Sequence, residues 1–135
     1  MIEKKSRPKQ LEGKTVKVRT GCGSMYVTLN GDGEGVFEVF AALGKSGSCA
    51  KVQAEALTRM VTLALKYGVP MKEIVDELVN LQCPNPIMFP DKDKVLSCPD
   101  GIARVLKQEV REEEEEERKV REEGEREVRE EGERV

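Results

Sequence analysis

The sequence predicts a small α+β domain, with a three-stranded antiparallel sheet, a long central helix, two further helices and a charged helical tail at the C-terminus. Three observations lead to this prediction. Short segments with the two-residue period of strands lie between residues 14 and 43, and apolar residues recur at helical spacing between residues 49 and 106. Residues 109–135 are dominated by charge.

Three strands are predicted before the first helix. Residues 14–20 alternate apolar and polar side chains, residues 25–29 form a second short segment, and residues 36–43 are more continuously apolar. The sequence Asn-Gly-Asp-Gly at residues 30–33 is typical of a hairpin connection. An antiparallel arrangement is therefore the simplest prediction.

The central helix is predicted over residues 49–67, where Gly68 ends it. Its apolar stripe is wide, which favours a helix that is packed on two sides. The residues of that stripe are Ala54, Leu57, Met60, Val61, Leu63, Ala64 and Leu65.

Two further helices follow. One starts at Pro70, whose missing N–H costs nothing in a first turn, and the other opens at Ser97-Cys98-Pro99-Asp100, with Ser97 or Cys98 as the cap. The residues expected to be buried by these helices are Ile74, Val75, Leu78, Leu81, Ile102, Val105 and Leu106.

The charge distribution divides the chain into three parts. Residues 109–135 hold 14 Glu and 7 Arg or Lys, a net charge of −7, so residues 1–108 carry +4 of the total of −3. We predict a flexible N-terminus over residues 1–12, a folded domain over residues 13–107, and an acidic tail over residues 108–135. The tail is either a solvated helix or disordered segment, or a helix that pairs with a partner or with its own copy.

The composition of the chain also predicts its cellular location. The chain lacks an apolar run of about 18 residues and begins with a charged segment, which predicts a cytoplasmic protein with no membrane contact. In a reducing compartment, cysteines are expected to be metal ligands or free thiols before disulfides. The abundance of Glu, Arg and Lys is compatible with a thermophilic source.

Four cysteines are the most informative residues of the chain. Cys22, Cys49, Cys83 and Cys98 each lie beside a turn or a helix start, and the chain has no histidine. Structural zinc prefers four thiolate or imidazole ligands, so these residues predict a single four-thiolate site. Because paired C-x-x-C knuckles are absent, free thiols and disulfides stay open as alternatives.

A glycine- and serine-rich segment precedes the central helix. It is a weak candidate for an anion or phosphate site, because a helix N-terminus attracts anions. Val39 occupies the position where a P-loop needs glycine, so NTP hydrolysis is not predicted. The alternative is an ordinary helix cap. The residues of this segment are Gly44, Lys45, Ser46, Gly47 and Ser48.

Other functional classes find less support. Without histidine, a Ser-His-Asp triad is impossible, and most carboxylates lie in the tail. Nucleic-acid binding through the basic N-terminal region is an alternative, but few aromatic residues there could stack bases, so nucleic acid is an unlikely partner. The basic residues concerned are Lys4, Lys5, Arg7, Lys9, Lys14, Lys17 and Arg19.

Four segments, residues 20–30, 37–50, 63–69 and 97–106, together resemble the TSCPD domain. This is the C-terminal domain of adenosylcobalamin-dependent (class II) ribonucleotide reductases, here as a stand-alone chain. The likeness covers about residues 15–107, and Leu96 stands where the signature has threonine.

The resemblance implies that Cys22, Cys49, Cys83 and Cys98 form a structural zinc site. It also implies a non-catalytic accessory or interaction module, because about 100 residues cannot contain the reductase barrel or its cobalamin site. Adenosylcobalamin is therefore not expected to bind this chain. Binding of a nucleotide or phosphate by this module is a further expectation. The expected partner is a ribonucleotide reductase subunit, with self-association through the tail as a further possibility. The alternative is a component of ribonucleoside-diphosphate reductase, in deoxyribonucleotide synthesis, whose cysteines are redox-active.

Overall fold

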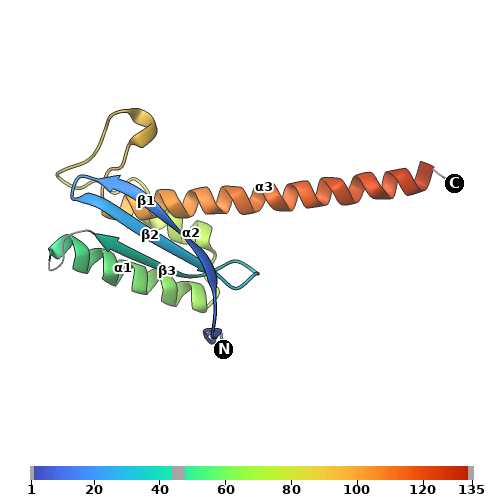
Figure 1. The fold of residues 1–135 in the computed structure, drawn as a ribbon, viewed down its shortest axis with the longest axis horizontal. Helices are drawn as coiled ribbons and strands as arrows, with labels where there is room; N and C mark the ends of the chain where they lie inside the picture. Colours follow the sequence, from blue (N-terminus) through green and yellow to red (C-terminus); the bar gives the residue numbers. More distant parts are fainter. Residues whose placement is uncertain (1, 44–47, 134–135) are drawn as a thin grey trace.

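The computed structural model describes residues 2–43 and 48–133 and confirms the α+β class. Three antiparallel strands lie in the order β1-β2-β3, and three helices and one 3-10 turn follow them (Figure 1). The elements are β1 (Glu12–Thr20), β2 (Gly23–Gly31), β3 (Val36–Leu43), α1 (Cys49–Lys66), α2 (Met71–Leu78), η1 (Asp91–Asp93) and α3 (Cys98–Glu133). Among the described residues, no helix is long and apolar enough to cross a membrane.

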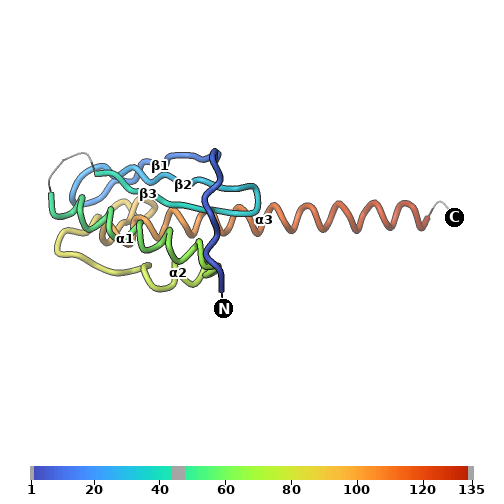
Figure 2. The backbone as a smooth tube through the Cα atoms, turned by 90° about the horizontal axis from the view of Figure 1, so that it is seen from below, coloured from blue at the N-terminus to red at the C-terminus, as the bar shows by residue number. Residues whose placement is uncertain are grey.

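One face of the sheet forms the core. The register pairs Val16 with Val27 and Val18 with Met25, so the alternating apolar residues of β1 and β2 share that face. The helix α3 packs against β1 and β2, and α2 packs against α3 (Figure 2). The buried core residues on these elements are Met25, Val27, Leu29, Val39, Leu43, Ile74, Val75, Ile102, Val105 and Leu106.

The helix α1 lies along the free edge of β3. The hydroxyl of Thr62 accepts a hydrogen bond from the backbone N–H of Val39 and donates one to its carbonyl, both at 3.0 Å. An uncovered edge strand exposes unpaired backbone groups that invite aggregation. The side chain of Thr62 therefore satisfies part of this edge, and α1 covers it.

This position corrects two sequence-based expectations. The stripe of α1 is buried on one side only, and Met60 is 64% exposed and Leu63 39% exposed because they face away from β3. Leu81 was expected to be buried by the second helix, but α2 ends at Leu78 and Leu81 is 50% exposed. Asn80, at φ 67°, redirects the chain before that residue.

The N-terminal segment is joined to the domain at two points. The backbone N–H of Lys5 donates to the carbonyl of Lys66 at 2.9 Å, and Arg7 donates to both carboxylate oxygens of Glu38 at 2.9 and 3.0 Å. Asn30 also donates to Glu38, at 2.9 Å. These bonds, led by the one from Arg7, hold the pKa of Glu38 below its usual value despite the burial of the carboxylate.

The helix α3 continues without interruption from the core to Glu133. It therefore crosses the predicted domain boundary near residue 107, and its distal part extends away from the sheet (Figure 1). The side chains of residues 114–133 are exposed. The three-part division of the chain stays a prediction.

Candidate functional site: a cysteine corner and two charged grooves

Three of the four cysteines meet where the β1–β2 turn, the loop after α2 and the start of α3 come together. We call Cys22, Cys83 and Cys98 the cysteine corner. The backbone N–H of Cys83 donates to the carbonyl of Leu96 at 2.9 Å, which places the loop beside the residues that precede α3.

The turn and the loop fit closely together. The side-chain amide of Asn85 donates to the carbonyl of Gly21 at 2.7 Å. A Cβ atom on Gly21 would lie 1.8 Å from the carbonyl oxygen of Asn85. Glycine is therefore required at position 21 so that the turn that carries Cys22 can pack against the loop that carries Cys83.

Cys83 and Cys98 are partly buried, whereas Cys22 is exposed. The Sγ of Cys98 lies 3.8 Å from the hydroxyl oxygen of Thr20, and the Sγ of Cys83 accepts from the N–H of Asn85 at 3.4 Å. Burial raises the pKa of the Cys98 thiol; the hydroxyl of Thr20 opposes this, and the neighbouring Cys22 and Cys83 raise the pKa further. Cys22 and Cys83 thus both lie close enough to Cys98 to influence its thiol.

The fourth cysteine, Cys49, lies at the same end of the sheet as the cysteine corner. Pairing of Leu43 with Met25 brings the end of β3 next to the start of β2, and α1 begins with Cys49, which is exposed (Figure 1). All four cysteines are free thiols. In the part of the chain that the structure describes, no three His, Cys, Asp or Glu side chains are placed to hold a metal ion. The donor types suit zinc, and the four-ligand site stays a prediction.

Asp100 holds the segments around the corner together. Its buried carboxylate accepts hydrogen bonds from the backbone N–H of Asn80 at 2.7 Å and of Leu96 at 2.8 Å, and from Arg104 at 2.7 Å. The N–H of Asp100 donates to the hydroxyl of Ser97 at 3.1 Å, so Ser97 is the cap of α3. The sequence indicated only that Asp100 belongs to the start of a helix; its links to distant backbone groups have no sequence signal.

The weak anion site falls mostly outside the described residues. Gly44, Lys45, Ser46 and Gly47 lie there, whereas Ser48 is the N-cap of α1 and accepts from the N–H of Lys51 at 3.1 Å. The capping role foreseen as the alternative is therefore present at Ser48.

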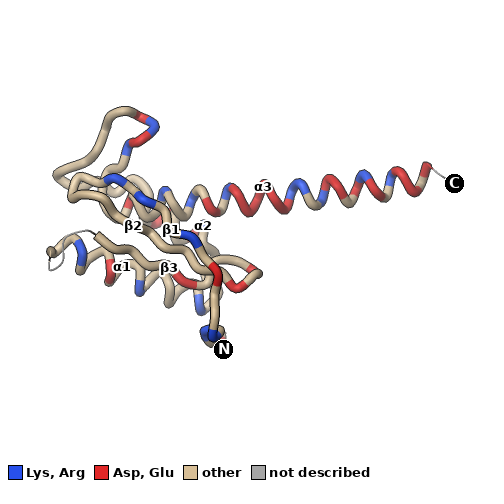
Figure 3. The backbone as a smooth tube through the Cα atoms, in the orientation of Figure 1, with Lys and Arg blue, Asp and Glu red and all other residues tan. Residues whose placement is uncertain are grey.

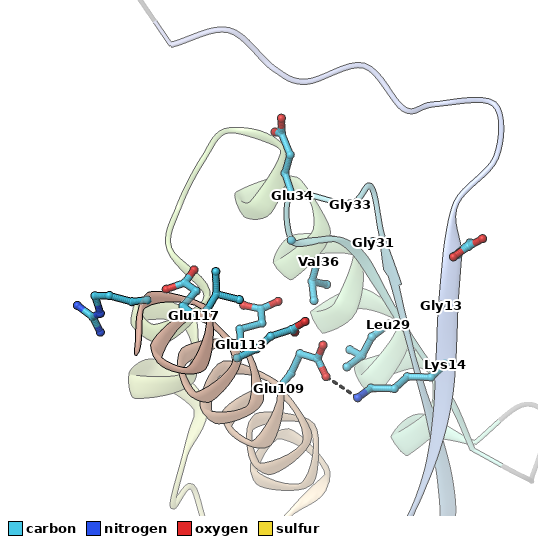
Figure 4. Close-up of a pocket in the computed structure, with 15 residues that line it drawn as sticks. Gly13, Lys14, Leu29, Gly31, Gly33, Glu34, Val36, Glu109, Glu113 and Glu117 are labelled. Carbon is cyan, nitrogen blue, oxygen red and sulfur yellow. Dashed lines mark ion pairs between the residues drawn. The ribbon is translucent and has the colours of Figure 1, made fainter. Parts of the chain in front are cut away.

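An acidic groove of about 790 Å³ lies between α3 and the N-terminal half of β1 (Figure 4). Lys14 enters it and pairs with Glu109 at 2.6 Å and with Glu112 at 3.1 Å. Burial raises the pKa of Glu113, and the carboxylates of Glu109, Glu117 and Glu116 raise it further. The acidic residues that line the groove are Glu12, Glu34, Glu109, Glu113, Glu116 and Glu117.

A basic groove of about 730 Å³ lies at the opposite end of the β1–α3 seam. Its lining residues come from the C-terminal half of β1, the loop around η1 and the first turns of α3. Figure 3 shows basic positions along each of these three segments. Seven of its lining residues are cationic and one, Asp93, is acidic. The cationic residues are Lys17, Arg19, Lys92, Lys94, Arg104, Lys107 and Arg111.

The basic groove differs from the N-terminal basic set that the sequence suggested. Lys17 and Arg19 belong to both, but Arg7 is bound to Glu38, and Lys14 is bound to Glu109 and Glu112. The remaining groove cations come from two later segments of the chain. Only the fold brings them together, so spacing along the sequence could not reveal the groove.

Comparison with known proteins places this architecture in a family. The family model of the TSCPD domain matches residues 2–110. Vitamin B12-dependent ribonucleotide reductases of Streptomyces clavuligerus and Streptomyces avermitilis are each 31% identical over 91 residues, 67% of this chain. The corresponding protein of Streptantibioticus cattleyicolor is 31% identical over 80 residues, 58% of this chain.

The shared region is a small part of those relatives. The match covers 10% of the Streptomyces clavuligerus protein, 9% of the Streptomyces avermitilis protein and 13% of the Streptantibioticus cattleyicolor protein. No solved structure matches the chain. The family match covers most of the chain, and its residues include the cysteine corner, Cys49 and the Ser-Cys-Pro-Asp start of α3. The chain belongs to the TSCPD domain family.

Proposed function

We propose that this chain is a non-catalytic accessory module in which four cysteines hold a structural zinc ion and the domain surface binds a ribonucleotide reductase subunit. The convergence of Cys22, Cys83 and Cys98 from three segments carries the proposal. The relatives are named vitamin B12-dependent ribonucleotide reductases, which supports a reductase as the partner and a cytoplasmic location. The reduction itself would belong to that partner.

Zinc would act here as a crosslink. Cys22, Cys83 and Cys98 would supply three thiolates, and Cys49 would supply the fourth from the start of α1. Such a site would tie the β1–β2 turn, the loop after α2 and two helix starts to one point. The binding free energy of a structural zinc site adds directly to folding, which matters for a domain of about 100 residues.

The outer face of α1 supports the interaction role. Val52 is 58% exposed and Met60 is 64% exposed, and Leu63 and Tyr67 continue the same face. Together with the exposed Ala56, these residues recur at helical spacing on the side that faces away from β3. An exposed apolar helix face is a common docking surface for another protein.

Metal analysis of purified protein tests the zinc site. We expect one zinc per chain, and we expect the thiols to resist a thiol reagent until a chelator is added. Cys49→Ser is the sharpest variant, because Cys49 is exposed and its replacement removes no buried side chain. It should lower zinc content while a surface control, Ser6→Ala, leaves it unchanged. Metal-free protein with a fast-reacting thiol would contradict the proposal.

The second candidate is a reductase component with redox-active cysteines. The observation that favours it is the proximity of three free thiols, of which Cys22 is exposed. This alternative predicts a reversible disulfide between two corner cysteines, formed under mild oxidation and detected by mass spectrometry of peptides. A chain that binds zinc and forms no such disulfide would exclude it.

A further inference from the structure

Most of the cationic side chains in the basic groove have no carboxylate partner within the described part of the chain. Of the groove's seven cations, only Arg104 has a carboxylate partner among the ion pairs of the described residues, at 2.7 Å from Asp100. Lys17 and Arg19 come from β1, Lys92 and Lys94 from the loop around η1, and the others from α3. Like charges that converge in this way repel one another, so a polyanion in the groove would relieve the repulsion.

One exposed aromatic ring lines the groove, and two others lie on the open face of the sheet. Phe89 lines the groove and is 87% exposed. Tyr26 and Phe40 are also exposed, at 43% and 50%, on the open face of the sheet. In the strand register, Tyr26 is paired with Lys17. Positive charge beside exposed aromatic rings is the usual surface of proteins that bind single-stranded nucleic acid.

We propose that the basic groove binds single-stranded nucleic acid. Lysine and arginine side chains contact successive phosphates, and Phe89 stacks on a base. The rings require an unpaired strand, because the bases of a duplex are already stacked on each other. This site is separate from the cysteine corner, and its occupant does not depend on zinc binding by the cysteines.

A competing occupant is the acidic extension of α3 from a second copy. Its charge also complements the groove, but its carboxylates are partly neutralised within the helix. Arg118 lies 3.9 Å from Glu122 and Lys119 lies 3.5 Å from Glu115. A helix also gives Phe89 no base to stack on. The nucleic acid therefore accounts for both the charge and the ring.

The test measures binding of a fluorescently labelled 12-nucleotide oligo-dT to the full chain by fluorescence anisotropy. Binding through about four phosphates should weaken about fiftyfold between 50 and 200 mM salt. The double variant Lys92→Glu, Lys107→Glu changes two exposed groove residues. The matched control, Lys9→Glu with Lys72→Glu, changes the net charge equally at exposed positions outside the groove.

We expect the groove variant to lose at least about tenfold more affinity than the control at 100 mM salt. Phe89→Ala should lose about fivefold or more, the usual effect of removing one stacking ring. Equal losses in the groove and control variants would show that binding reflects net charge alone and would overturn the proposal. So would an absence of oligonucleotide binding at 50 mM salt.

Two competitors identify the occupant. A peptide of residues 109–135 should compete poorly with the oligonucleotide, and a 12-base-pair duplex should bind more weakly than the single strand. Tight peptide binding without oligonucleotide binding would instead assign the groove to a second copy of the chain. Zinc content is measured on the same samples. Protein that holds zinc but binds no oligonucleotide would overturn the groove proposal alone, and protein that binds the oligonucleotide without zinc would overturn the zinc proposal alone.

Discussion

Asp100 is the residue whose removal should cost this domain most. Its carboxylate is fully buried and accepts from Asn80, Leu96 and Arg104. In Asp100→Asn, an amide N–H₂ would face one of these donors and the charge opposite Arg104 would be lost. We expect the free energy of unfolding to fall by about 2–3 kcal/mol, as measured by urea denaturation.

The matched control is Asp91→Asn, at an exposed position at the start of η1. Its effect should stay within about 0.5 kcal/mol, as for most surface substitutions. Similar losses in both variants would mean that the network around Asp100 contributes little.

Gly21 allows the β1–β2 turn, which carries Cys22, to pack against the loop that carries Cys83. In Gly21→Ala the new methyl group would meet the backbone oxygen of Asn85, so the β1–β2 turn and the loop at Cys83 must separate. We expect a loss of about 1–3 kcal/mol in stability and a lower zinc content by metal analysis. Gly124→Ala is the control, since its methyl group would enter open space. Alanine is also the better helix former, so stability should not fall and the zinc content should not change. Full zinc content in Gly21→Ala would refute this role of the turn.

At the scale of the element, the hydroxyl of Thr62 helps to hold α1 against β3, together with the buried Ala54 and Val61. Thr62→Val keeps the shape of the side chain but leaves the N–H and carbonyl of Val39 without their partner. We expect the free energy of unfolding to fall by about 1–3 kcal/mol, as measured by urea denaturation. Thr15→Val removes an exposed hydroxyl that contacts only Thr28, so it should be nearly neutral. If the two variants behave alike, α1 does not depend on its bond to the β3 edge.

The distal part of α3 makes few contacts with the rest of the domain. A chain truncated after Gln108 loses the ion pairs of Lys14 with Glu109 and Glu112, and ion pairs at an exposed surface contribute little to stability. We therefore expect the urea midpoint to change little and the helical circular-dichroism signal to drop. Light scattering on the same samples tests self-association through the tail, and equal oligomeric states in both chains would contradict it.

At the scale of the whole molecule, acid should loosen the N-terminal segment. The pKa of Glu38 is lower in the folded chain, so its contribution to stability is complete above about pH 4.3, the usual pKa of glutamate. That contribution is lost as the pH falls through the lower, folded-state pKa. Glu38→Gln should thus be less stable than the parent at pH 7, and the difference should shrink toward pH 3 in thermal unfolding.

Glu34→Gln serves as the control for this pH dependence, because Glu34 is an exposed residue between β2 and β3. Its stability should follow that of the parent at every pH. A constant difference between Glu38→Gln and the parent across the range would disprove the linkage.

The sequence predicted the fold better than the site, for a physical reason. Periodicity of apolar residues is a local property, so residues 14–43 indicated strands, and the spacing around Val105 indicated a buried helix face. The approach of Cys22 to Cys98 depends on how distant segments pack, which no local pattern records. The same holds for Lys17 and Lys107 in the basic groove. Polar contacts such as that of Thr62 with β3 have no periodic signal either.

The unbroken course of α3 has a mechanical consequence. Its 36 residues measure about 54 Å at the usual rise per residue. The helix is therefore a rigid spacer that begins at Cys98. A partner bound near Glu133 would be held at a fixed distance from one bound at the cysteine corner. A lateral force on the C-terminal end of the helix would therefore act on its first turn, which carries Cys98 and Asp100.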